Sequence, residues 1–411
     1  MINKKILCRN CGNKKLLKLF SLGNLAYSGK FPKFKKIDVA KEEITLVMCS
    51  SCKLVQLSKN FNPKFLYSKD YGYRSGINKT MSEHLSKVSQ KLSILTNLNK
   101  GDAVLDIASN DGTLLNSYKK KGIVKVGIDP IINKFKKFYK KNDYQIKDFF
   151  SYKSIIKKKI NNKFKIITAL AVFYDLKKPN YFLKDIKKLI DKKKGIFVLE
   201  FADLLSLVKY NLFDTICHEH LAYYTSKIII DMVKKNNLKV FDIDTNDING
   251  GSVRFYICND EADYKINKRN INSYLRKEKK YRLESQKTFL NFFKDISVIK
   301  KKVNNIIKKI NFNKKTIHGY GASTKGNILL QYFDINNKQI PYIADRNLEK
   351  NGTFTPGTKI KIITEKKSRK LHPDYYLVLP WHFKKEILKR EKKIAAMGTK
   401  FIFPLPKIKI H

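Results

Sequence analysis

The middle of the chain alternates short apolar segments with polar segments of helical spacing, and this alternation constrains the fold more than any other feature. The apolar segments, each long enough for one strand, lie at residues 103–107, 125–128, 165–172 and 195–201. Strands that alternate with helices along a chain form a parallel sheet with helices on both faces. We therefore expect an α/β fold with a doubly wound sheet at its centre.

A similar pattern returns near the C-terminus. Strands and one helix are expected there, in this order, at residues 316–320, 325–333, 340–344 and 375–379. This order predicts a second doubly wound unit. Between the two units we expect further strands at residues 238–243 and 253–258 and one charged helical stretch at 271–310.

The first 65 residues contain only short apolar pieces between turns, which is too little for a core of their own. They carry two cysteine pairs with CxxC spacing, Cys8, Cys11, Cys49 and Cys52. Two such pairs in a reducing compartment are typical of a four-thiolate zinc site, which is closed to substrate and therefore structural. We expect zinc to hold this small module together.

Length and composition narrow the class of protein. A chain of 411 residues fits two or three domains. The net charge of +51 comes mostly from lysines spread over the whole chain, which predicts solvated faces and no nucleic-acid partner. No apolar run approaches the roughly 20 residues of a membrane span, and residues 1–15 lack a signal-peptide core. We expect a cytoplasmic protein without a membrane partner.

Residues 104–113 run from an apolar strand into a turn of small residues at the start of a helix. Such a turn lies at the carboxyl end of its strand, where backbone N–H groups meet the polar end of a ligand. Asp129 follows the next expected strand, about 20 residues after the turn. This is the usual position of a carboxylate that binds ribose hydroxyls. These features predict a nucleoside-cofactor pocket, with Asp148 and residues 169–174 at the same edge. The spacing alone fits either NAD or S-adenosylmethionine.

The densest group of ionisable side chains is Cys217-His218-Glu219-His220. His218 and His220 have the spacing of a strand and could bind a metal, but no further ligand lies near them in the sequence. Histidine is also the side chain best suited to move a proton near neutral pH, and an adjacent carboxylate can set its tautomer. We favour this catalytic interpretation over structural hydrogen bonding. A polar-aromatic loop at residues 65–76 is either a lid or packing between domains.

The chain resembles the NDP-deoxysugar C-methyltransferases along nearly all of its length. The resemblance rests on an ordered set of motifs: the paired CxxC module, residues 71–76, Ser109-Asn110-Asp111-Gly112, residues 217–220, Asn249-Gly250-Gly251-Ser252, residues 319–326 and Pro356-Gly357-Thr358. It implies a zinc-binding module at residues 1–68 and a class I, Rossmann-like methyltransferase domain at 69–248 that binds S-adenosylmethionine. A C-terminal Rossmann-like domain at 249–411 then helps to bind a nucleotide-sugar. A monomer is compatible with this arrangement.

The same resemblance implies roles for individual residues. His220 is the base that removes a proton beside a keto group of the sugar, and His218 is the alternative base. Glu219 orients a neighbouring group, and Tyr71 or Tyr73 donates a hydrogen bond. The residues expected to bind S-adenosylmethionine are Asp106, Ala108, Asn110, Asp111, Asp129 and Asp148. Those expected to bind the nucleotide-sugar are Tyr224, Asn249, Gly250, Gly321, Ala322, Ser323, Thr324 and Lys325.

The sequence departs from the family pattern at three places. Cys217 stands where a tyrosine often precedes the His-Glu-His stretch, which removes a hydroxyl from the expected sugar pocket. Ala108 replaces the glycine that begins the cofactor turn. We expect a small effect there, since alanine fits most backbone conformations that do not require a positive φ. Phe173-Tyr174-Asp175 occupies a strand end where asparagine and histidine are expected.

Two other functions would use some of the same features. A NAD-dependent sugar-nucleotide oxidoreductase or epimerase would share both Rossmann-like units. A zinc-containing RNA-binding protein would use the lysine surplus, and its affinity would fall steeply with salt. The second function leaves the histidine segment unexplained, whereas a C-methyltransferase accounts for every motif.

Overall fold

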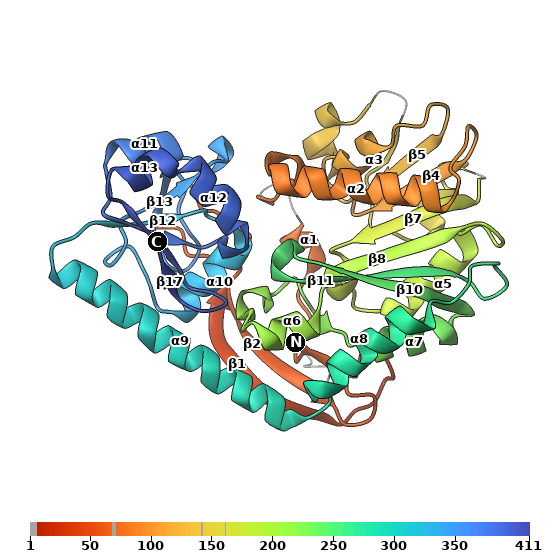
Figure 1. Cartoon of the computed structure of the whole chain (residues 1–411), viewed down its shortest axis with the longest axis horizontal. Helices are drawn as coiled ribbons and strands as arrows, with labels where there is room; N and C mark the ends of the chain where they lie inside the picture. The colour runs from red at the N-terminus through yellow and green to blue at the C-terminus, as the bar shows by residue number, and fades with distance from the viewer. Residues whose placement is uncertain (1–5, 68–70, 141–142, 161) are drawn as a thin grey trace.

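The computed structural model describes residues 6–67, 71–140, 143–160 and 162–411. Its strands form three sheets, of four, seven and six strands. In Figure 1 the seven-stranded sheet and its helices lie on the right and the six-stranded sheet lies on the left. The long N-terminal strands curve beneath both. The expected α/β architecture with two doubly wound units is confirmed.

The four-stranded sheet is antiparallel and has the order β1-β2-β3-β9. Its strands are β1 (Leu16–Ala26), β2 (Lys41–Cys49), β3 (Val55–Leu57) and β9 (Ala222–Tyr223). A short helix, α1 (Pro63–Leu66), follows β3. Because β9 comes from the middle of the chain and pairs with β3, the segment that carries His220 is anchored to the N-terminal module.

The seven-stranded sheet has the order β10-β11-β8-β7-β4-β5-β6. Its parallel strands are β4 (Ala103–Ile107), β5 (Val124–Ile128), β6 (Tyr144–Ile146), β7 (Phe164–Leu170) and β8 (Ile196–Ala202). Two antiparallel strands, β10 (Leu238–Asn246) and β11 (Ser252–Asn259), extend the β8 edge. The middle sheet therefore continues past residue 248, where the sequence predicted the domain to end, because β11 hydrogen-bonds to β8 along its length.

Helices cover both faces of this sheet (Figure 1). They are α2 (Lys79–Leu95), α3 (Thr113–Ser117), α4 (Tyr152–Ile156), α5 (Pro179–Leu189), α6 (Leu204–Lys209) and α7 (Ser226–Lys235). In α5, Pro179 sets the first turn, and Phe182, Leu183 and Ile186 follow at the spacing of one buried face. The polar segment of helical spacing that follows residues 125–128 contains a 3₁₀ helix, η2 (Ile132–Phe138). Its buried residues are three apart, which matches three residues per turn.

The six-stranded sheet has the order β14-β13-β12-β15-β16-β17. Its strands are β12 (Ile317–Tyr320), β13 (Tyr342–Asp345), β14 (Lys361–Thr364), β15 (Tyr375–Val378), β16 (Lys400–Phe403) and the antiparallel β17 (Lys409–Ile410). Its helices are α10 (Thr324–Tyr332), α11 (Glu365–Lys370), α12 (Lys384–Arg390) and α13 (Lys392–Ala396). The single helical stretch expected before this unit is two helices, α8 (Lys268–Lys280) and α9 (Gln286–Phe312). Arg282, with a φ of 49°, lies in the break between them.

One apolar core connects all three sheets. The ring of Phe20 in β1 lies 5.6 Å from that of Phe292 and 5.0 Å from that of Phe293, both in α9. The ring of Phe213 lies 5.5 Å from that of Phe333 at the end of α10. Burial of a side chain of this size contributes about 1.5–3 kcal/mol. Because Phe213 lies only four residues before Cys217, the histidine segment begins close to where the sheets meet.

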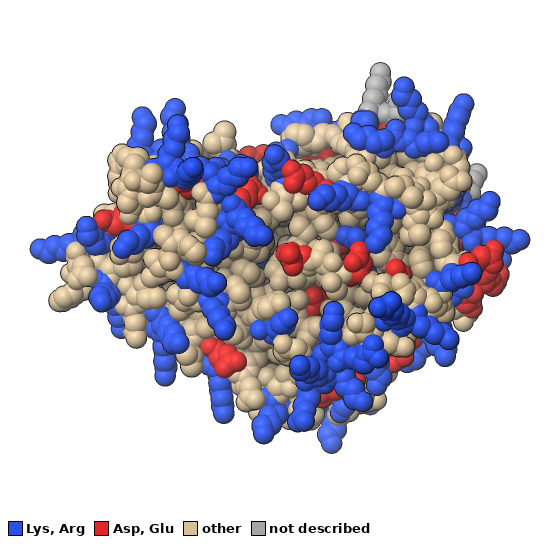
Figure 2. All heavy atoms as spheres, viewed as in Figure 1, with Lys and Arg blue, Asp and Glu red and all other residues tan. Residues whose placement is uncertain are grey.

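The charge of the protein is spread over its surface. Figure 2 shows lysine and arginine side chains over the whole visible face, with acidic side chains between them. This distribution agrees with solvated faces and shows no single basic stripe on that side. Within the part of the chain that the structure describes, no helix is long and apolar enough to cross a membrane.

Candidate active site

The turn after β4 forms the first part of the candidate cofactor site. β4 ends at Ile107 and α3 begins at Thr113, so the turn lies at the carboxyl edge of the sheet. Ala108, Asn110 and Gly112 have φ angles of 58°, 50° and 72°. This left-handed backbone costs a residue with a Cβ roughly 1–2 kcal/mol. The expectation of a small effect at Ala108 is therefore wrong, because the position requires a positive φ.

Replacing Ala108 by glycine should stabilise the protein. Glycine adopts a positive φ without steric cost, although its larger entropy in the unfolded chain offsets part of the gain. We expect the free energy of unfolding to rise by about 0.5–1 kcal/mol, measured by chemical denaturation. The matched change Ala103→Gly, in the buried strand β4, should lower it by about 1 kcal/mol. A less stable Ala108→Gly variant would contradict the strain assigned to this turn.

Asp129, just after β5, faces the turn. Its Oδ2 atom accepts a hydrogen bond from the Asn110 N–H at 3.0 Å, and its Oδ1 atom accepts one from the Ile131 N–H at 2.8 Å. Burial raises the pKa of Asp129, and these two hydrogen bonds lower it. Each carboxylate oxygen can accept more than one hydrogen bond, so acceptor capacity remains for ribose hydroxyls. A carboxylate beside the amides of such a turn fits a nucleoside cofactor.

The other acidic residues of this edge differ in their surroundings. Asp106 lies in β4 and is only 5% exposed. Thr168 Oγ1 donates to its Oδ1 atom at 2.7 Å, and burial raises its pKa to about 7. Asp148 is exposed and accepts the N–H of the next residue at 2.8 Å. Asp106 therefore supports the turn from inside the sheet, whereas Asp148 is open to solvent at its edge.

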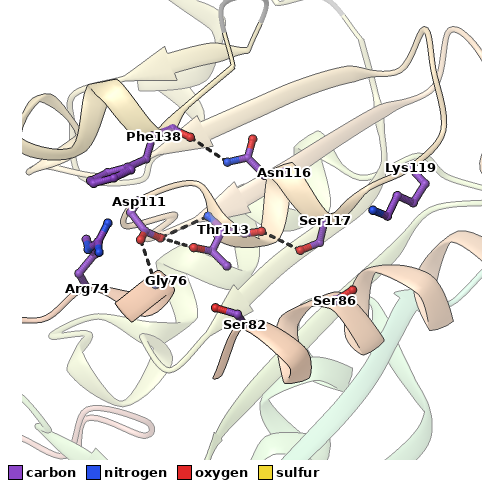
Figure 3. Close-up of a pocket in the computed structure, with 10 residues that line it drawn as sticks. All are labelled: Arg74, Gly76, Ser82, Ser86, Asp111, Thr113, Asn116, Ser117, Lys119 and Phe138. Atoms are coloured by element: carbon purple, nitrogen blue, oxygen red, sulfur yellow. Dashed lines mark hydrogen bonds between the residues drawn. The ribbon is translucent and has the colours of Figure 1, made fainter. Parts of the chain in front are cut away.

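Residues 71–77 cross over the cofactor turn (Figure 3). The Ser75 N–H donates to Asn110 Oδ1 at 3.0 Å, and the Gly76 N–H donates to Asp111 Oδ2 at 2.9 Å. A cavity of about 390 Å³ flanks this contact, lined by Arg74, Gly76, Ser82, Ser86, Asp111, Thr113, Asn116, Ser117, Lys119 and Phe138. Within the loop at residues 65–76, which the sequence left as a lid or as domain packing, residues 75 and 76 thus lie directly on the cofactor turn, and residues 68–70 lie outside the described part of the chain.

His220 is held in one tautomer by the backbone. Its Nδ1 atom lies 2.6 Å from the carbonyl oxygen of Thr215. Because a carbonyl only accepts, Nδ1 carries the hydrogen and Nε2 keeps its lone pair. The Tyr174 ring packs on the imidazole with 4.0 Å between centroids. Burial, with the charge of Lys325, lowers the His220 pKa to about 3, so the ring is neutral at cellular pH.

His218 has different surroundings. Its ring lies 4.5 Å from that of Tyr27 and 4.9 Å from that of Phe61, both in the N-terminal module. The side chain is fully buried, and neither ring nitrogen has a hydrogen-bond partner among the described residues. Burial lowers its pKa to about 4. His218 therefore packs into the N-terminal module, whereas His220 lies against Tyr174 near the carboxyl end of β7.

Glu219 belongs to a group of five side chains that each carry a dissociable proton. We name this group the acidic cluster, and its members are Tyr67, Tyr71, Asp175, Cys217 and Glu219. Burial raises the pKa of every member. The Tyr67 hydroxyl donates to Asp175 Oδ2 at 2.6 Å, and its ring lies 5.3 Å from that of Tyr71. Sequence reasoning missed Tyr67, whose place in the site depends on Asp175, a residue distant in the chain.

The structure separates the two tyrosines that were expected as donors. Tyr71 lies close enough to Glu219 and Asp175 for their charges to raise its pKa further, after burial. Tyr73 is 44% exposed and lies nearer the cofactor turn, where the Asp111 charge acts on it. Tyr71 is therefore the tyrosine of the acidic cluster, and Tyr73 belongs to the cofactor side.

The C-terminal unit builds a second turn of the same kind. Asp345, at the end of β13, accepts the Ala322 N–H on Oδ2 and the Asn347 N–H on Oδ1, both at 2.7 Å. Asp129 makes the same pair of bonds at the first turn. Sequence reasoning missed Asp345, although its position after the second strand of the unit was a usable signal.

The glycine-rich loop of this turn is fixed by close contacts. Gly321 has a φ of 84°, and a Cβ there would lie 2.5 Å from Pro380. Ser323 caps α10 by accepting the N–H of Gly326 at 2.9 Å. An ideal Cβ on Gly29 would lie 3.2 Å from Glu219 Oε1 and 3.9 Å from Thr324 Oγ1. The start of α10 therefore lies beside the acidic cluster.

Lys325 joins the loop to the other units. Its Nζ atom donates to the carbonyl oxygen of Asn249 at 3.0 Å. Burial lowers its pKa, while the charge of Asp214 raises it. Gly250 packs so closely on Trp381 that a Cβ would lie 2.5 Å from the ring. Four of the expected substrate residues, Ser323, Thr324, Lys325 and Asn249, thus lie close to one another.

Tyr224, also expected to contact substrate, lies in the core. Its ring is 5.2 Å from that of Phe173 and 5.8 Å from that of Phe201. It is 2% exposed, and the charge of Arg9 in the N-terminal module acts on its hydroxyl. The structure therefore places Tyr224 in the packing between the module and the middle sheet.

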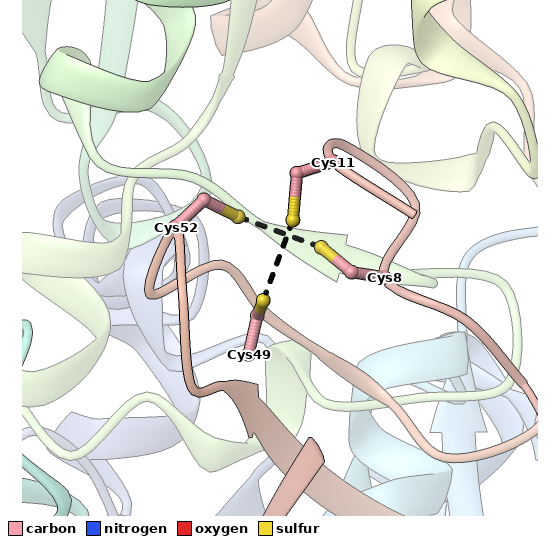
Figure 4. A group of neighbouring side chains, drawn as sticks. All are labelled: Cys8, Cys11, Cys49 and Cys52. Atoms are coloured by element: carbon pink, nitrogen blue, oxygen red, sulfur yellow. Dashed lines mark hydrogen bonds between the residues drawn. The ribbon is translucent and has the colours of Figure 1, made fainter. Parts of the chain in front are cut away.

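The four cysteines of the CxxC pairs converge in space (Figure 4). The Sγ atoms of Cys8 and Cys52 are 3.5 Å apart, those of Cys11 and Cys49 are 3.6 Å apart, and all four lie within 4.8 Å of one another. Thiolates at about 2.3 Å from a tetrahedral zinc ion are separated by about 3.8 Å. A hydrogen bond from Cys8 lowers the pKa of Cys52 to about 5. The cluster fits a four-thiolate zinc site.

Known protein families match this arrangement along the chain. Their models match, in order, a zinc binding domain at residues 8–67, a methyltransferase domain at 74–243 and the C-methyltransferase C-terminal domain at 247–406. The chain belongs to the C-methyltransferases. Its middle domain therefore uses S-adenosylmethionine, not NAD, and its N-terminal module holds zinc, as the sequence predicted.

One curated relative and two solved structures illustrate what the chain is similar to. C-methyltransferase NovU of Streptomyces niveus is 26% identical over 411 residues, which cover 98% of this chain and 96% of that protein. An S-adenosylmethionine-dependent methyltransferase from Clostridium acetobutylicum is 12% identical and covers 43% of this chain and 92% of its own, with a TM-score of 0.34. Magnesium protoporphyrin IX methyltransferase from Synechocystis PCC 6803, with bound SAM, is 14% identical. The match covers 43% of this chain and 79% of that chain, with a TM-score of 0.33.

Proposed function

We propose that this C-methyltransferase acts on a nucleotide-linked sugar with a keto group and methylates the carbon next to that group. The observation that carries the proposal is His220. Its imidazole is neutral, Nε2 has no hydrogen-bond partner among the described residues, and the ring lies near enough to Lys325 of the C-terminal loop for that charge to act on it. Methylation at carbon needs a carbanion equivalent, and a base beside a ketone creates one.

In this mechanism His220 Nε2 takes the proton from the carbon beside the keto group. The electron pair of that C–H bond moves into an enolate, whose carbon then forms the new bond to the methyl group. Thr215 holds the Nδ1 hydrogen, so the imidazole accepts the proton without reorienting. The enolate oxygen gains negative charge and needs a donor. Tyr71 supplies it, and Glu219, whose charge acts on Tyr71, orients that hydroxyl.

The cofactor site would be formed by residues already described. S-adenosylmethionine, when bound, would supply an electrophilic methyl group on a sulfonium, and the methyl–sulfur bond would break as the new carbon bond forms, so that the neutral thioether leaves. Asp129 would accept hydrogen bonds from its ribose, the turn at residues 108–112 would lie beside the cofactor, and Asp106 would support the turn from β4. The loop at residues 71–77 would exclude water from this side of the site.

Replacing Asp129 by alanine should weaken the binding of S-adenosylmethionine by roughly 1.5–3 kcal/mol, the range for a hydrogen bond to a charged group. Calorimetry measures this as a rise in Kd of roughly 10–150-fold. Because Asp129 also accepts two backbone N–H groups, Asp129→Asn is the matched variant that keeps the shape. It should lose less affinity. Unchanged binding in Asp129→Ala, or preference of the parent protein for NAD, would contradict the assignment.

The C-terminal loop would bind the nucleotide part. Backbone amides at the start of α10 and the Lys325 ammonium suit a diphosphate. Asp345 suits the ribose, since it copies the hydrogen bonds of Asp129. The sugar would then extend from Lys325 toward His220.

We also place the enzyme in the cytoplasm, since none of its six cysteines, all of them in the described part, forms a disulfide.

Isotope-labelled S-adenosylmethionine and a panel of nucleotide-linked 4-keto-sugars provide the test. The products are identified by mass spectrometry and NMR. A labelled methyl group on a carbon next to the ketone supports the proposal. Label on oxygen or nitrogen, or no transfer to any member of the panel, overturns it.

A further inference from the structure

The strand order of the six-stranded sheet indicates where the C-terminal unit binds a ligand. The chain passes from β12 to β13 and β14, and then crosses to β15 and β16 on the other side of β12. In an open α/β sheet, ligands bind at the carboxyl ends of the strands between which the order reverses. Here that place, the C-terminal switch point, lies between the ends of β12 and β15. The seven-stranded sheet reverses between β4 and β7, and its cofactor turn follows β4.

Two segments flank the C-terminal switch point. The glycine-rich loop at residues 321–324 follows β12, and residues 380–382 follow β15 and lead into the 3₁₀ helix η7 (Trp381–Phe383). The two segments touch, since an ideal Cβ on Gly321 would lie 2.5 Å from Pro380. The helices that begin after them, α10 and α12, lie on the side of the C-terminal unit that faces the middle sheet (Figure 1). A ligand bound there would therefore lie next to the middle domain.

Trp381 holds the second of these segments in place. Its Nε1 atom donates to Asp214 Oδ2 at 2.9 Å, and a Cβ on Gly250 would lie 2.5 Å from its ring. The carbonyl oxygen of the residue before Gly250 accepts the hydrogen bond of Lys325 at 3.0 Å. Residues 249–250 thus contact both Lys325 and the residue that directly precedes His382. His382 and Lys325 are therefore positioned by the same short segment of the chain.

His382 places an imidazole at the C-terminal switch point. Its side chain is partly buried, and its ring lies 4.2 Å from that of Phe383 and 5.5 Å from that of Trp381. The Nδ1 atom is enclosed and has no hydrogen-bond partner among the described residues, so Nε2 is the nitrogen that a ligand can reach. Burial, and then the charge of Lys325, holds the pKa of His382 well below its ordinary value. The neutral ring has one N–H, which finds an acceptor only on the Nε2 side.

The other side of the switch point suits an anion. α10 begins there, and the Lys325 ammonium has two further hydrogens, since it donates one to a backbone carbonyl. A diphosphate has more acceptor oxygens than one ammonium can satisfy, so a donor on the facing segment adds to its affinity. Pro380 has no N–H, and the Trp381 N–H already donates to Asp214. His382 is the side chain of that segment whose donor remains for a ligand.

We propose that His382 is a substrate-binding residue, and that its Nε2–H donates a hydrogen bond to a phosphate oxygen of the nucleotide-sugar from the side opposite Lys325. The diphosphate then lies between the ends of β12 and β15, held by the start of α10 on one side and by the imidazole on the other. This inference rests on the proposed function, because it adds a residue to the nucleotide site of the C-terminal unit.

The test measures the binding of uridine diphosphate and thymidine diphosphate by calorimetry. In His382→Phe, which keeps a ring but has no donor, the Kd of the diphosphate that binds the parent should rise roughly 10–100-fold, the range for a hydrogen bond to a charged group. His382→Gln returns an N–H near the position of Nε2, and its Kd should lie within roughly 3-fold of the parent value. The matched control is His372→Phe, a change at an exposed histidine of the same unit, which should bind like the parent.

The outcomes separate this inference from the proposed function. A parent-like Kd in His382→Phe overturns the inference and leaves the proposed nucleotide site standing. Equal losses in His382→Phe and His382→Gln also overturn it, since they would assign the imidazole to packing. Binding of neither diphosphate by the parent protein overturns both. Calorimetry with S-adenosylmethionine checks that each variant is folded, so a loss in His382→Phe that His382→Gln restores supports the hydrogen bond.

Discussion

Replacing His220 by asparagine should lower both proton exchange at the substrate carbon and methyl transfer by roughly 10²–10⁴-fold. Asparagine keeps a polar side chain of similar size but has no basic nitrogen at the position of Nε2. Exchange is measured by NMR in deuterated buffer without S-adenosylmethionine, so the proton step is observed apart from methylation. Cofactor affinity should stay near the parent value, since the His220 ring contacts Thr215 and Tyr174, which lie outside the turn at residues 108–112.

The matched variant is His218→Asn, which tests the alternative base. His218 packs between Tyr27 and Phe61, so its replacement should lower stability more than it lowers the exchange rate per folded molecule. Parent-rate exchange in His220→Asn would show that the base is another residue. Loss of exchange in a folded His218→Asn protein would move the role to His218.

The pH profile gives a second measure of the same histidine. A base must be unprotonated, and burial with the Lys325 charge lowers the His220 pKa from its ordinary 6.5 to about 3. The neutral ring is therefore present above that value and is lost only as the pH falls through it. The acid limb of kcat/KM, which reports the free enzyme, should lie well below pH 6.5. In the substrate complex a diphosphate beside Lys325 should move this limb of kcat upward.

The strands of both doubly wound units were predictable because their signal is local. Each parallel strand, such as β4 or β8, is a short apolar run that is buried on both faces, and the turns between them carry small and polar residues. The four zinc ligands were predictable for a similar reason, since CxxC spacing places two thiolates on one turn. The ends of the helices were harder to predict from the sequence than the strands. The expected stretch at residues 271–310 breaks at Arg282, where nothing in the local sequence marks a stop.

The parts of the site that the sequence did not predict depend on contacts between distant segments. His218 and His220 are equivalent in sequence, and only the position of Thr215 and the aromatic side chains of the N-terminal module distinguish them. Tyr67 enters the site because its hydroxyl meets Asp175, more than a hundred residues away. The left-handed backbone at Ala108 follows from the turn, not from the residue, because alanine does not favour that conformation.

Two hydrogen bonds connect the zinc site to the active site, one from the Arg9 side chain and one between backbone groups. Arg9 lies between two of the cysteines, and its guanidinium donates to the carbonyl oxygen of Leu57 at 2.9 Å. Leu57 ends β3, and its N–H donates to the carbonyl oxygen of Leu221 at 2.9 Å. Leu221 directly follows His220 in the chain. We therefore expect zinc bound at the cysteines to fix, through Arg9 and β3, the segment that carries the proposed base.

Replacing Cys49 by serine should remove zinc and reduce methyl transfer by roughly 10-fold or more, while S-adenosylmethionine affinity stays within about 2-fold of the parent. The cofactor turn keeps its own supports in β4 and β5, so the loss should be confined to the N-terminal sheet and β9. Metal analysis measures the zinc, and hydrogen exchange should show lost protection at Leu57 and Tyr223 before the middle sheet opens. The matched variant Ser51→Ala, an exposed change between the same cysteines, should retain zinc and activity. A zinc-free Cys49→Ser protein with parent activity would contradict the coupling between this site and His220.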